Sequence, residues 1–235
     1  MLRTHTQTGG STLTAQQPLN NIARSAIQAL AAVSGGVQSL ALSCYDEALA
    51  LPTEDAQQTA LRTQQIIAHE SGAADTIDPF AGSYYVESLT NSLEAEALKI
   101  MDHIDDLGGA AASIESGYMQ AEIQEASVQW QQEVESKERT IVGVNAYIDP
   151  SEDATPLFRP NHEIAQEQLN RLERLRKNRD IEAVNEALNY LREQTRTDTN
   201  LMPAIIECVR VYATLGEICH IFRDEWGEYT PVTVV

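Results

Sequence analysis

The sequence predicts an α/β fold in which two parallel βα units are followed by a mostly helical region. Two short stretches, residues 2–6 and 37–43, are each bounded by polar or glycine-rich turns, as strands are. Each is followed by a segment whose apolar residues recur at helical spacing, and from residue 75 onward this spacing dominates. Strands that alternate with helices through short connections are typical of parallel sheets.

The two βα units have clear helix boundaries. Residues 20–33 predict the first helix, because apolar side chains recur every three or four positions and a glycine pair follows. The second strand, 37–43, is a short apolar stretch and is expected to be buried. Thr53 is a suitable N-cap for a second helix that extends to Gly72. Two such units leave long strand edges exposed, so we expect them to be part of something larger.

The rest of the chain is predicted to be mostly helical. Apolar residues at helical spacing predict helices over 85–107, around Trp130, and over 164–175, 181–191 and 205–222, the last being one helix or two. A short strand is expected at 140–144, and the loop 149–161, rich in Asp, Pro and Glu, is typical of a linker. We therefore expect one domain over residues 1–148 and a helical linker region over 149–235.

The charge of the chain is strongly negative. Sixteen Lys and Arg residues stand against 35 Asp and Glu, a formal charge of −19, which argues against nucleic acid or an anionic membrane as the main partner. Only three of the basic residues are lysines, a composition that suits a very salty cytoplasm and leads to a halophilic hypothesis. Seven basic residues fall between Arg171 and Arg196, either as a solvated helical face or as a docking surface for an acidic neighbour.

Cysteine spacing and hydropathy exclude several classes of protein. Cys44, Cys208 and Cys219 lie far apart without a CxxC pair, so neither a disulfide framework nor a zinc site is predicted. No apolar run reaches the roughly 18 residues that a membrane span needs, and the N-terminus shows no signal peptide. The sequence therefore predicts a cytoplasmic protein with no membrane partner.

The polar loops that follow the two predicted strands are the candidate sites. The first contains His5, Gln7 and Gly10; a phosphate cradle is disfavoured there because about ten residues and a proline separate Gly10 from the next helix. A structural turn and a site loop both remain open, since βα-barrel enzymes place their sites at such strand ends. After the second strand, Asp46 and Glu47 are candidates for capping, ligation or acid–base chemistry.

The remaining histidines give no recognisable catalytic or metal-binding pattern. His69 and Glu70 are adjacent and would point to different sides of a helix, which disfavours a metal pair. His103 and His220 each stand alone on a predicted helix. No Ser-His-Asp, Cys-His or HExxH arrangement can be assembled from the sequence, so no catalytic residue and no metal ligand is assigned.

Four long stretches closely resemble the acyl-CoA mutase family typified by methylmalonyl-CoA mutase. They are RTHTQTGGSTLTAQQPLNNIARSAIQALAAV, GGVQSLALSCYDEALALPTE, RTQQIIAHESGAADTIDPFAGSYYVESLT and IVGVN. The resemblance implies the C-terminal portion of a (β/α)8 TIM barrel, followed by a helical region that leads towards a cobalamin-binding domain. The DxHxxG motif that supplies the lower cobalt ligand in that domain does not occur in this sequence.

The resemblance also implies a function and partners. It implies a partial large subunit of an adenosylcobalamin-dependent acyl-CoA mutase, an isomerase that rearranges the carbon skeleton of methylmalonyl-CoA and succinyl-CoA by radical chemistry. Activity would need an acyl-CoA substrate, a chain that carries the rest of the barrel and a cobalamin-binding subunit, so the isolated chain is expected to be inactive. The alternatives are an isobutyryl-CoA or 2-hydroxyisobutyryl-CoA mutase subunit, and a non-catalytic fragment or assembly module.

Carried over by position, the family's cobalamin contacts fall on Gln7, Gly10, Glu47 and Ala50. Gln7 can hydrogen-bond corrin amides, Gly10 allows a close backbone approach, and Glu47 can accept hydrogen bonds from amides or a ribose. The acyl-CoA-binding arginines and the catalytic Tyr and His of the family lie on earlier strands, outside this sequence.

The second strand departs from the family pattern. Where the family usually has GGTQSLHTN, this chain has GGVQSLALS, so Ala41, Leu42 and Ser43 replace His, Thr and Asn. This strand end is expected to face the active cavity, where each cofactor or substrate group left without a partner costs about 1–3 kcal/mol. The departure predicts either impaired catalysis or an altered substrate.

Overall fold

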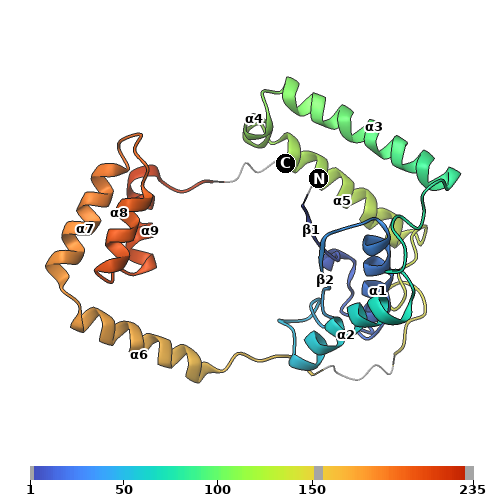
Figure 1. Cartoon of the computed structure of the whole chain (residues 1–235), viewed down its shortest axis with the longest axis horizontal. Coiled ribbons are helices and arrows are strands. Elements are labelled where there is room, and N and C mark those ends of the chain that lie inside the picture. The colour runs from blue at the N-terminus through green and yellow to red at the C-terminus, as the bar shows by residue number, and fades with distance from the viewer. Residues whose placement is uncertain (1–2, 151–155, 231–235) are drawn as a thin grey trace. The chain divides into compact units, whose positions relative to one another are not determined.

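The structure is a computed structural model that describes residues 3–150 and 156–230. It divides into two compact units, of which the first ends at Arg159 and the second begins at Pro160 (Figure 1). The division falls inside the loop 149–161 that the sequence presents as a linker; residues 151–155 of that loop lie outside the described residues.

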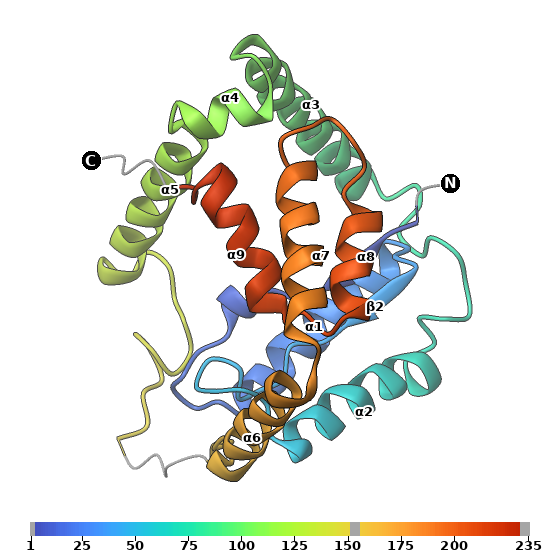
Figure 2. The same cartoon turned by 90° about the vertical axis from the view of Figure 1, so that its left-hand side faces the viewer.

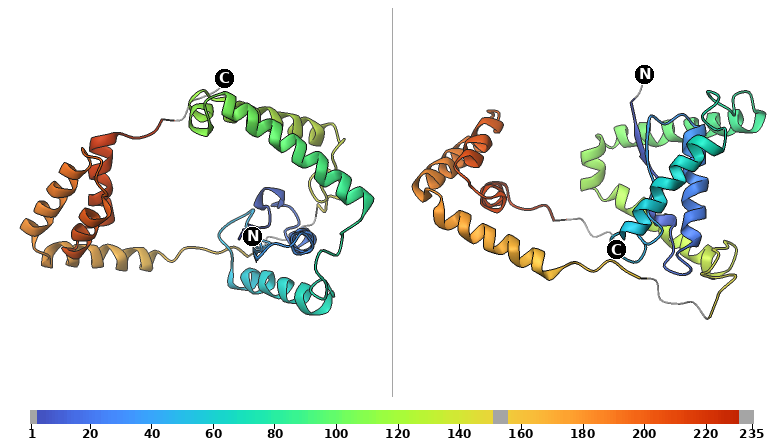
Figure 3. Two further views of the ribbon diagram at one scale, coloured as in Figure 1. Left: turned by 45° about the horizontal axis from the view of Figure 1, so that its top comes forward. Right: turned by 60° about the horizontal axis from the view of Figure 1, so that its bottom comes forward.

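The first unit is organised by a small parallel sheet. Strand β1 (His5–Gln7) pairs with β2 (Ser39–Ala41) in the register that sets His5 opposite Ser39 and Gln7 opposite Ala41. Helix α1 (Asn20–Ser34) connects the two strands and α2 (Glu54–Glu70) follows β2, so the predicted βα order is confirmed. The helices α1 and α2 lie side by side (Figure 3).

Both strands are shorter than predicted, and β2 is not fully buried. Ser39 is exposed, whereas Leu42, just after the strand, packs with Ala29 of α1 and Ile67 of α2 in the core of this unit. Among the described residues each strand pairs only with the other, so its outer edge lacks the hydrogen bonds that would extend it. The predicted cap of α2 is confirmed, since the Thr53 side chain accepts a hydrogen bond from the Ala56 amide.

Three helices follow within the same unit. They are α3 (Tyr84–Asp106), the short α4 (Ala110–Glu115) and α5 (Tyr118–Glu135). The predicted helices over 85–107 and around Trp130 are confirmed, whereas α4 was not predicted. Gly108 and Gly109 separate α3 from α4 with φ angles of +98° and +91°, which glycine adopts without strain. None of the residues of α3 is buried within the described chain.

The predicted strand at 140–144 is wrong. This segment forms turns, with an isolated bridge between Val142 and Ala146, and Gly143 takes a φ of +85° that a regular strand does not allow. Asn145 holds the turns together, because its side-chain amide donates to the carbonyls of Val134 and Arg139 at 2.9 and 2.7 Å. Local side-chain hydrogen bonds thus replace the neighbouring strand that an extended conformation would need.

The second unit is helical. It contains α6 (His162–Asn178), α7 (Ile181–Gln194), α8 (Met202–Arg210) and α9 (Leu215–Trp226), which confirms the predicted helices and resolves 205–222 into two. Helices α8 and α9 pack against α7 (Figure 2). Their core consists of Leu191, Ala204, Cys208, Ile218 and Ile221. No helix in the described part of the chain is long and apolar enough to cross a membrane.

Candidate functional site

The two strands present different residues to their two faces. Leu40 packs beside the Ala29–Leu42–Ile67 core, on the face that the helices cover. Since side chains alternate along a strand, the paired residues His5 and Ser39, and Gln7 and Ala41, share the opposite face. The imidazole Nδ1 of His5 lies 2.8 Å from the Ser39 hydroxyl, so the two strands are also joined by a side-chain hydrogen bond.

The loops after the two strands are held together by a buried hydroxyl pair. The Ser43 amide donates to the Thr8 hydroxyl at 2.8 Å, and the Ser43 hydroxyl donates to the Thr8 carbonyl at 3.0 Å. Both residues are buried, with 6% of Thr8 and 2% of Ser43 exposed. This pair fixes the carboxyl ends of β1 and β2 relative to each other, which is where parallel βα folds place their sites.

This arrangement brings Gly10 and Glu47 together. A Cβ atom at Gly10 would lie 3.9 Å from the Ser43 hydroxyl and 4.0 Å from the Glu47 carboxylate, so the missing side chain leaves an open surface beside the carboxylate. Neither the Glu47 carboxylate nor the exposed Gln7 amide has a hydrogen-bonding partner among the described residues. Ala50 lies further along the same loop, where its amide donates to the Asp46 carbonyl at 3.1 Å.

Asp46 organises the second loop. Its side chain is 1% exposed, and its Oδ2 accepts hydrogen bonds from both the amide and the hydroxyl of Thr53 at 2.9 Å. Of the alternatives open for this carboxylate, capping of the loop that leads into α2 is therefore the observed use. Its Oδ1 is buried and has no partner among the described residues.

The nearby Cys44 is not an activated nucleophile. Burial raises the pKa of its thiol to about 11, and the negative charges of Glu47 and Asp46 act in the same direction. A nucleophilic cysteine needs a lowered pKa, so this environment keeps the thiol protonated near neutral pH.

Asn21 and Arg24, which the sequence did not single out, tie three segments together. Asn21 is fully buried, and its side-chain amide donates to the carbonyls of Thr14 and Tyr45 at 2.9 and 2.8 Å. Arg24 donates to the Thr14 hydroxyl and, at 2.8 Å, to the Val142 carbonyl. The one sequence feature that could have identified Asn21 is its place as a polar residue on the buried face of a predicted amphipathic helix.

The structure changes the meaning of the family departure at 41–43. We expected all three residues to line a cavity, and this is wrong for Leu42, whose side chain lies in the core between α1 and α2. Ser43 satisfies its polar groups internally through Thr8. Of the three departures, only Ala41 removes a polar side chain from the face that Gln7 and Ser39 share.

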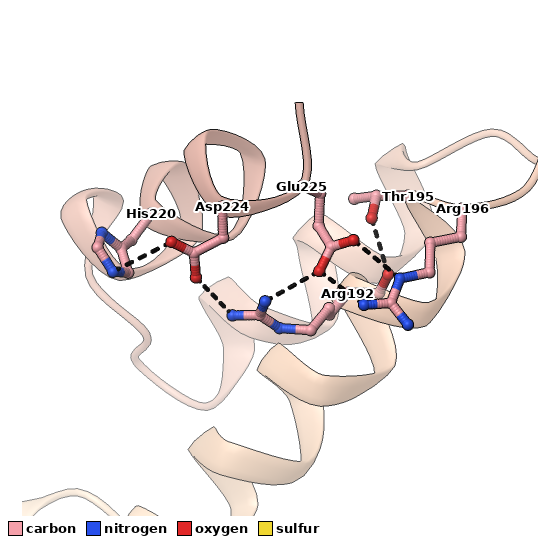
Figure 4. A network of polar contacts seen from close by, with 6 residues as sticks. All are labelled: Arg192, Thr195, Arg196, His220, Asp224 and Glu225. Carbon is pink, nitrogen blue, oxygen red and sulfur yellow. Dashed lines mark hydrogen bonds and ion pairs between the residues drawn. The ribbon is translucent and has the colours of Figure 1, made fainter. Parts of the chain in front are cut away.

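Three arginines of the basic segment 171–196 are paired within the second unit. Arg192 lies between Asp224 and Glu225 at 2.7 and 2.9 Å, and Arg196 contacts Glu225 at 2.8 Å (Figure 4). Arg179 donates two hydrogen bonds to Glu217, which also closes the capping box of α9. For these three arginines, the acidic neighbour is therefore helix α9 of the same chain.

These ion pairs lower the pKa of both glutamates. The hydrogen bonds from Arg179 hold the pKa of Glu217 at about 2, and those from Arg196 and Arg192 do the same for Glu225. His220 lies 3.5 Å from Asp224 and adds to the network when it is protonated. Within the described residues, no group of three or more His, Cys, Asp or Glu side chains could hold a metal ion.

Comparison with known proteins places the chain in a family. The sequence profile described as Methylmalonyl-CoA mutase matches residues 1–228. The methylmalonyl-CoA mutase of Escherichia coli (strain K12) is 46% identical over 229 residues, which are 97% of this chain and 32% of that protein. The methylmalonyl-CoA mutase of Rhizobium meliloti is 40% identical over 237 residues, 100% of this chain and 33% of that protein.

A third relative carries a different name. The 2-hydroxyisobutanoyl-CoA mutase large subunit of Aquincola tertiaricarbonis is 42% identical over 235 residues, which are 98% of this chain and 42% of that subunit. The chain thus spans 32% to 42% of the length of these three relatives. Because the family profile matches nearly the whole sequence, the chain belongs to the methylmalonyl-CoA mutase family.

Proposed function

We propose that the chain is a partial large subunit of an adenosylcobalamin-dependent acyl-CoA mutase that interconverts methylmalonyl-CoA and succinyl-CoA together with partner chains. The observation that carries the proposal is the apposition of Gly10 and Glu47 at the carboxyl ends of two parallel strands. Both are positions to which the family resemblance assigns cobalamin contacts. Family membership supports the reaction class, since the relatives are named as mutases.

The residues at this edge fit one side of a corrin. Gly10 has no side chain to hold a flat macrocycle away from the backbone, and the Gln7 amide offers both a donor and an acceptor. Glu47 can accept hydrogen bonds from corrin amides or from a ribose, and no described residue competes for its carboxylate. Ala50 adds a small side chain on the same loop.

Each residue would have a positioning role in the reaction. Adenosylcobalamin supplies the radical chemistry of the rearrangement when it is bound. Gln7 and Glu47 would orient the macrocycle through hydrogen bonds, while the Thr8–Ser43 pair keeps the loop of Gly10 against that of Glu47. The covered corrin face would be shielded from water, which protects reactive intermediates from side reactions.

We also propose that the first unit is the C-terminal part of a (β/α)8 barrel. Two parallel βα units with unpaired outer edges among the described residues support this, because further parallel strands on those edges would complete such a sheet. Residues 1–148 would form the barrel part, and 149–235 would lead towards a cobalamin-binding domain.

Three other functions are alternatives. The Aquincola relative supports a 2-hydroxyisobutyryl-CoA mutase subunit, and an isobutyryl-CoA mutase subunit belongs to the same substrate class. The loss of a polar side chain at Ala41 favours the third alternative, a non-catalytic fragment that serves assembly.

The test is co-expression of this chain with the portions of the E. coli relative that it does not match, supplied as separate polypeptides. We expect the complex to bind adenosylcobalamin and to isomerise one of methylmalonyl-CoA, isobutyryl-CoA and 2-hydroxyisobutyryl-CoA, whereas the isolated chain turns over none. Rapid isomerisation by the isolated chain would refute the partial-site argument, and cobalamin binding without turnover would support the assembly alternative.

Two glycine variants sharpen the cofactor assignment. Gly10→Ala places a methyl group on the proposed corrin surface at ordinary contact distances from Ser43 and Glu47, so the fold should tolerate it. We expect Gly10→Ala to lower the affinity of the co-expressed complex for cobalamin about tenfold, or by about 1.4 kcal/mol. Gly9→Ala is the matched control, because its added methyl group would meet Thr12 and Gln28 instead. Equal affinities for the two variants would contradict the placement of the corrin at Gly10.

A further inference from the structure

Asp46 is a buried residue in the loop that carries two of the four proposed cobalamin contacts. The loop, residues 44–53, connects β2 to α2 and consists of turns and bends without a regular helix or strand. Such a segment lacks the repeating backbone hydrogen bonds that hold helices and sheets in shape. Its conformation therefore depends on individual hydrogen bonds, and Asp46 accepts several of them.

The backbone of Asp46 places both cofactor positions of this loop. Its carbonyl accepts hydrogen bonds from the amides of Leu49 at 2.9 Å and Ala50 at 3.1 Å. Glu47 is the next residue in the chain, and among the described residues its carboxylate has no hydrogen-bonding partner. Because no hydrogen bond of its own holds the Glu47 side chain, its place beside Gly10 follows from the backbone of the loop.

The side chain of Asp46 fastens this turn to the start of α2. Its Oδ2 accepts hydrogen bonds from the amide and the hydroxyl of Thr53, both at 2.9 Å. The same hydroxyl accepts a hydrogen bond from the Ala56 amide in the first turn of α2. Only 1% of Asp46 is exposed, so water does not compete for these bonds. Asp46 therefore links the N-terminus of α2 to the turn of Glu47 and Ala50.

The geometry does not suit direct contact between Asp46 and a ligand. Oδ2 is engaged by Thr53, and Oδ1 is buried without a hydrogen-bonding partner among the described residues. A group that binds a cofactor or moves a proton has to come within hydrogen-bonding distance of it. The enclosed carboxylate can act on the site only through the loop that it holds.

We propose that Asp46 is a positioning residue for cobalamin, which acts through Glu47 and Ala50 by holding their turn against the N-terminus of α2. The inference rests on the proposed function and adds a residue that does not itself touch the cofactor. Groups that are already held in their binding geometry lose less conformational entropy when the ligand binds. Asp46 has to supply one acceptor oxygen at the place of Oδ2, which an amide can replace and a methyl group cannot.

The experiment measures the affinity of the co-expressed complex for adenosylcobalamin. Asp46→Ala removes the acceptor, so we expect the affinity to fall about tenfold. Asp46→Asn keeps an acceptor oxygen for Thr53 and should stay within about threefold of wild type. Ile67→Val is the matched control, because it removes a methyl group from the core of the same unit, on α2 and outside the loop. We expect it to lower the melting temperature without lowering the affinity.

A double-mutant cycle with Glu47→Ala separates positioning from a general loss of stability. If Asp46 acts through Glu47, Asp46→Ala should cost about threefold or less once Glu47 is truncated, because the side chain that it aligns is gone.

Three results would overturn the inference alone, provided that the wild-type complex binds cobalamin. They are wild-type affinity of Asp46→Ala, equal losses from Asp46→Ala with and without Glu47→Ala, and an affinity of Asp46→Asn as low as that of Asp46→Ala. A loss of affinity in Ile67→Val as large as in Asp46→Ala would also overturn it, since lost stability would then explain both. Failure of the wild-type complex to bind cobalamin would overturn the proposed function together with the inference.

Discussion

The two units of this chain differ in how much of their apolar surface they bury internally. The second unit closes a core in which Leu191 and Cys208 have no exposed surface, and its ion pairs join α7 to α9. The first unit has a smaller core of Ala29, Leu42 and Ile67, with α3 unburied and an open groove beside α1. A two-stranded sheet cannot cover this much apolar surface.

The difference shows which contacts order the first unit. Its tightest contacts are polar ones, the Thr8–Ser43 pair and the Asn21 network, and they hold the loops at the carboxyl ends of the strands. Several of its apolar side chains, among them Ile27 and Leu93, are exposed. Such a pattern is typical of a piece whose site geometry is set locally and whose stability comes from further protein.

The largest effect is expected in the core of the second unit. Leu191→Ala should destabilise that unit by about 2–5 kcal/mol, because the cavity it leaves lies among α7, α8 and α9. Hydrogen exchange resolved by segment should show faster exchange over 181–226 and little change over 3–150. Leu169→Ala on α6, where the side chain is 54% exposed, is the control. Loss of protection in both units together would show that they unfold as one.

A smaller effect is expected from the polar network of the first unit. Asn21→Ala leaves the carbonyls of Thr14 and Tyr45 without their donor, so stability should fall by about 1–3 kcal/mol, with increased exchange in both loops. Asn20→Ala is the matched control, since Asn20 is exposed and donates only to Gln17 among the bonds described here. If the two variants lost equal stability in denaturant unfolding, the loops would not depend on the buried amide.

The ion pairs of the second unit predict its response to acid. The pKa of Glu217 is lowered from 4.5 to about 2, so the folded state holds this carboxylate ionised more strongly than the unfolded state does. The stabilisation is therefore full above about pH 4.5 and is lost as the pH falls towards 2. Glu217→Gln should cost about 1–2 kcal/mol at neutral pH and flatten the loss below pH 4.5. An unchanged pH profile in that variant would assign the acid sensitivity elsewhere.

The smallest effect is expected from added salt, and its size should again differ between the two units. Residues 1–159 contain 7 basic and 22 acidic residues, a net charge of −15, while 160–235 contain 9 and 13, a net charge of −4. Screening of like charges between low and molar salt should stabilise the first unit by about 1 kcal/mol and the second by less. Thermal unfolding in potassium chloride measures this, and a chain whose stability did not rise would contradict the halophilic hypothesis.

Much of the secondary structure follows from local sequence. The spacing of apolar residues and the caps at Thr53 and Gly35 predicted α1 and α2 closely, because these signals act within a few residues. The strand at 140–144 was wrong for the opposite reason. A strand needs a neighbour, and the Asn145 side chain offered the backbone a local alternative.

The candidate site was likewise predicted only in part from the sequence. Gln7, Gly10, Glu47 and Ala50 were named from sequence resemblance, and their assignment to cobalamin remains a proposal. The sequence did not show that Leu42 turns into the core, because the direction of a side chain at a strand end depends on which face the helices cover.

The sequence by itself determined the family, most of the helices and the two polar loops, since motifs and periodicity are properties of neighbouring residues. Only the tertiary structure decided that Gly10 lies against Glu47, that Asn21 joins the loops, and that α1 keeps an open apolar side. These features join residues that lie far apart in the chain, so they depend on the pairing of β1 with β2 and the packing of α1 on α2.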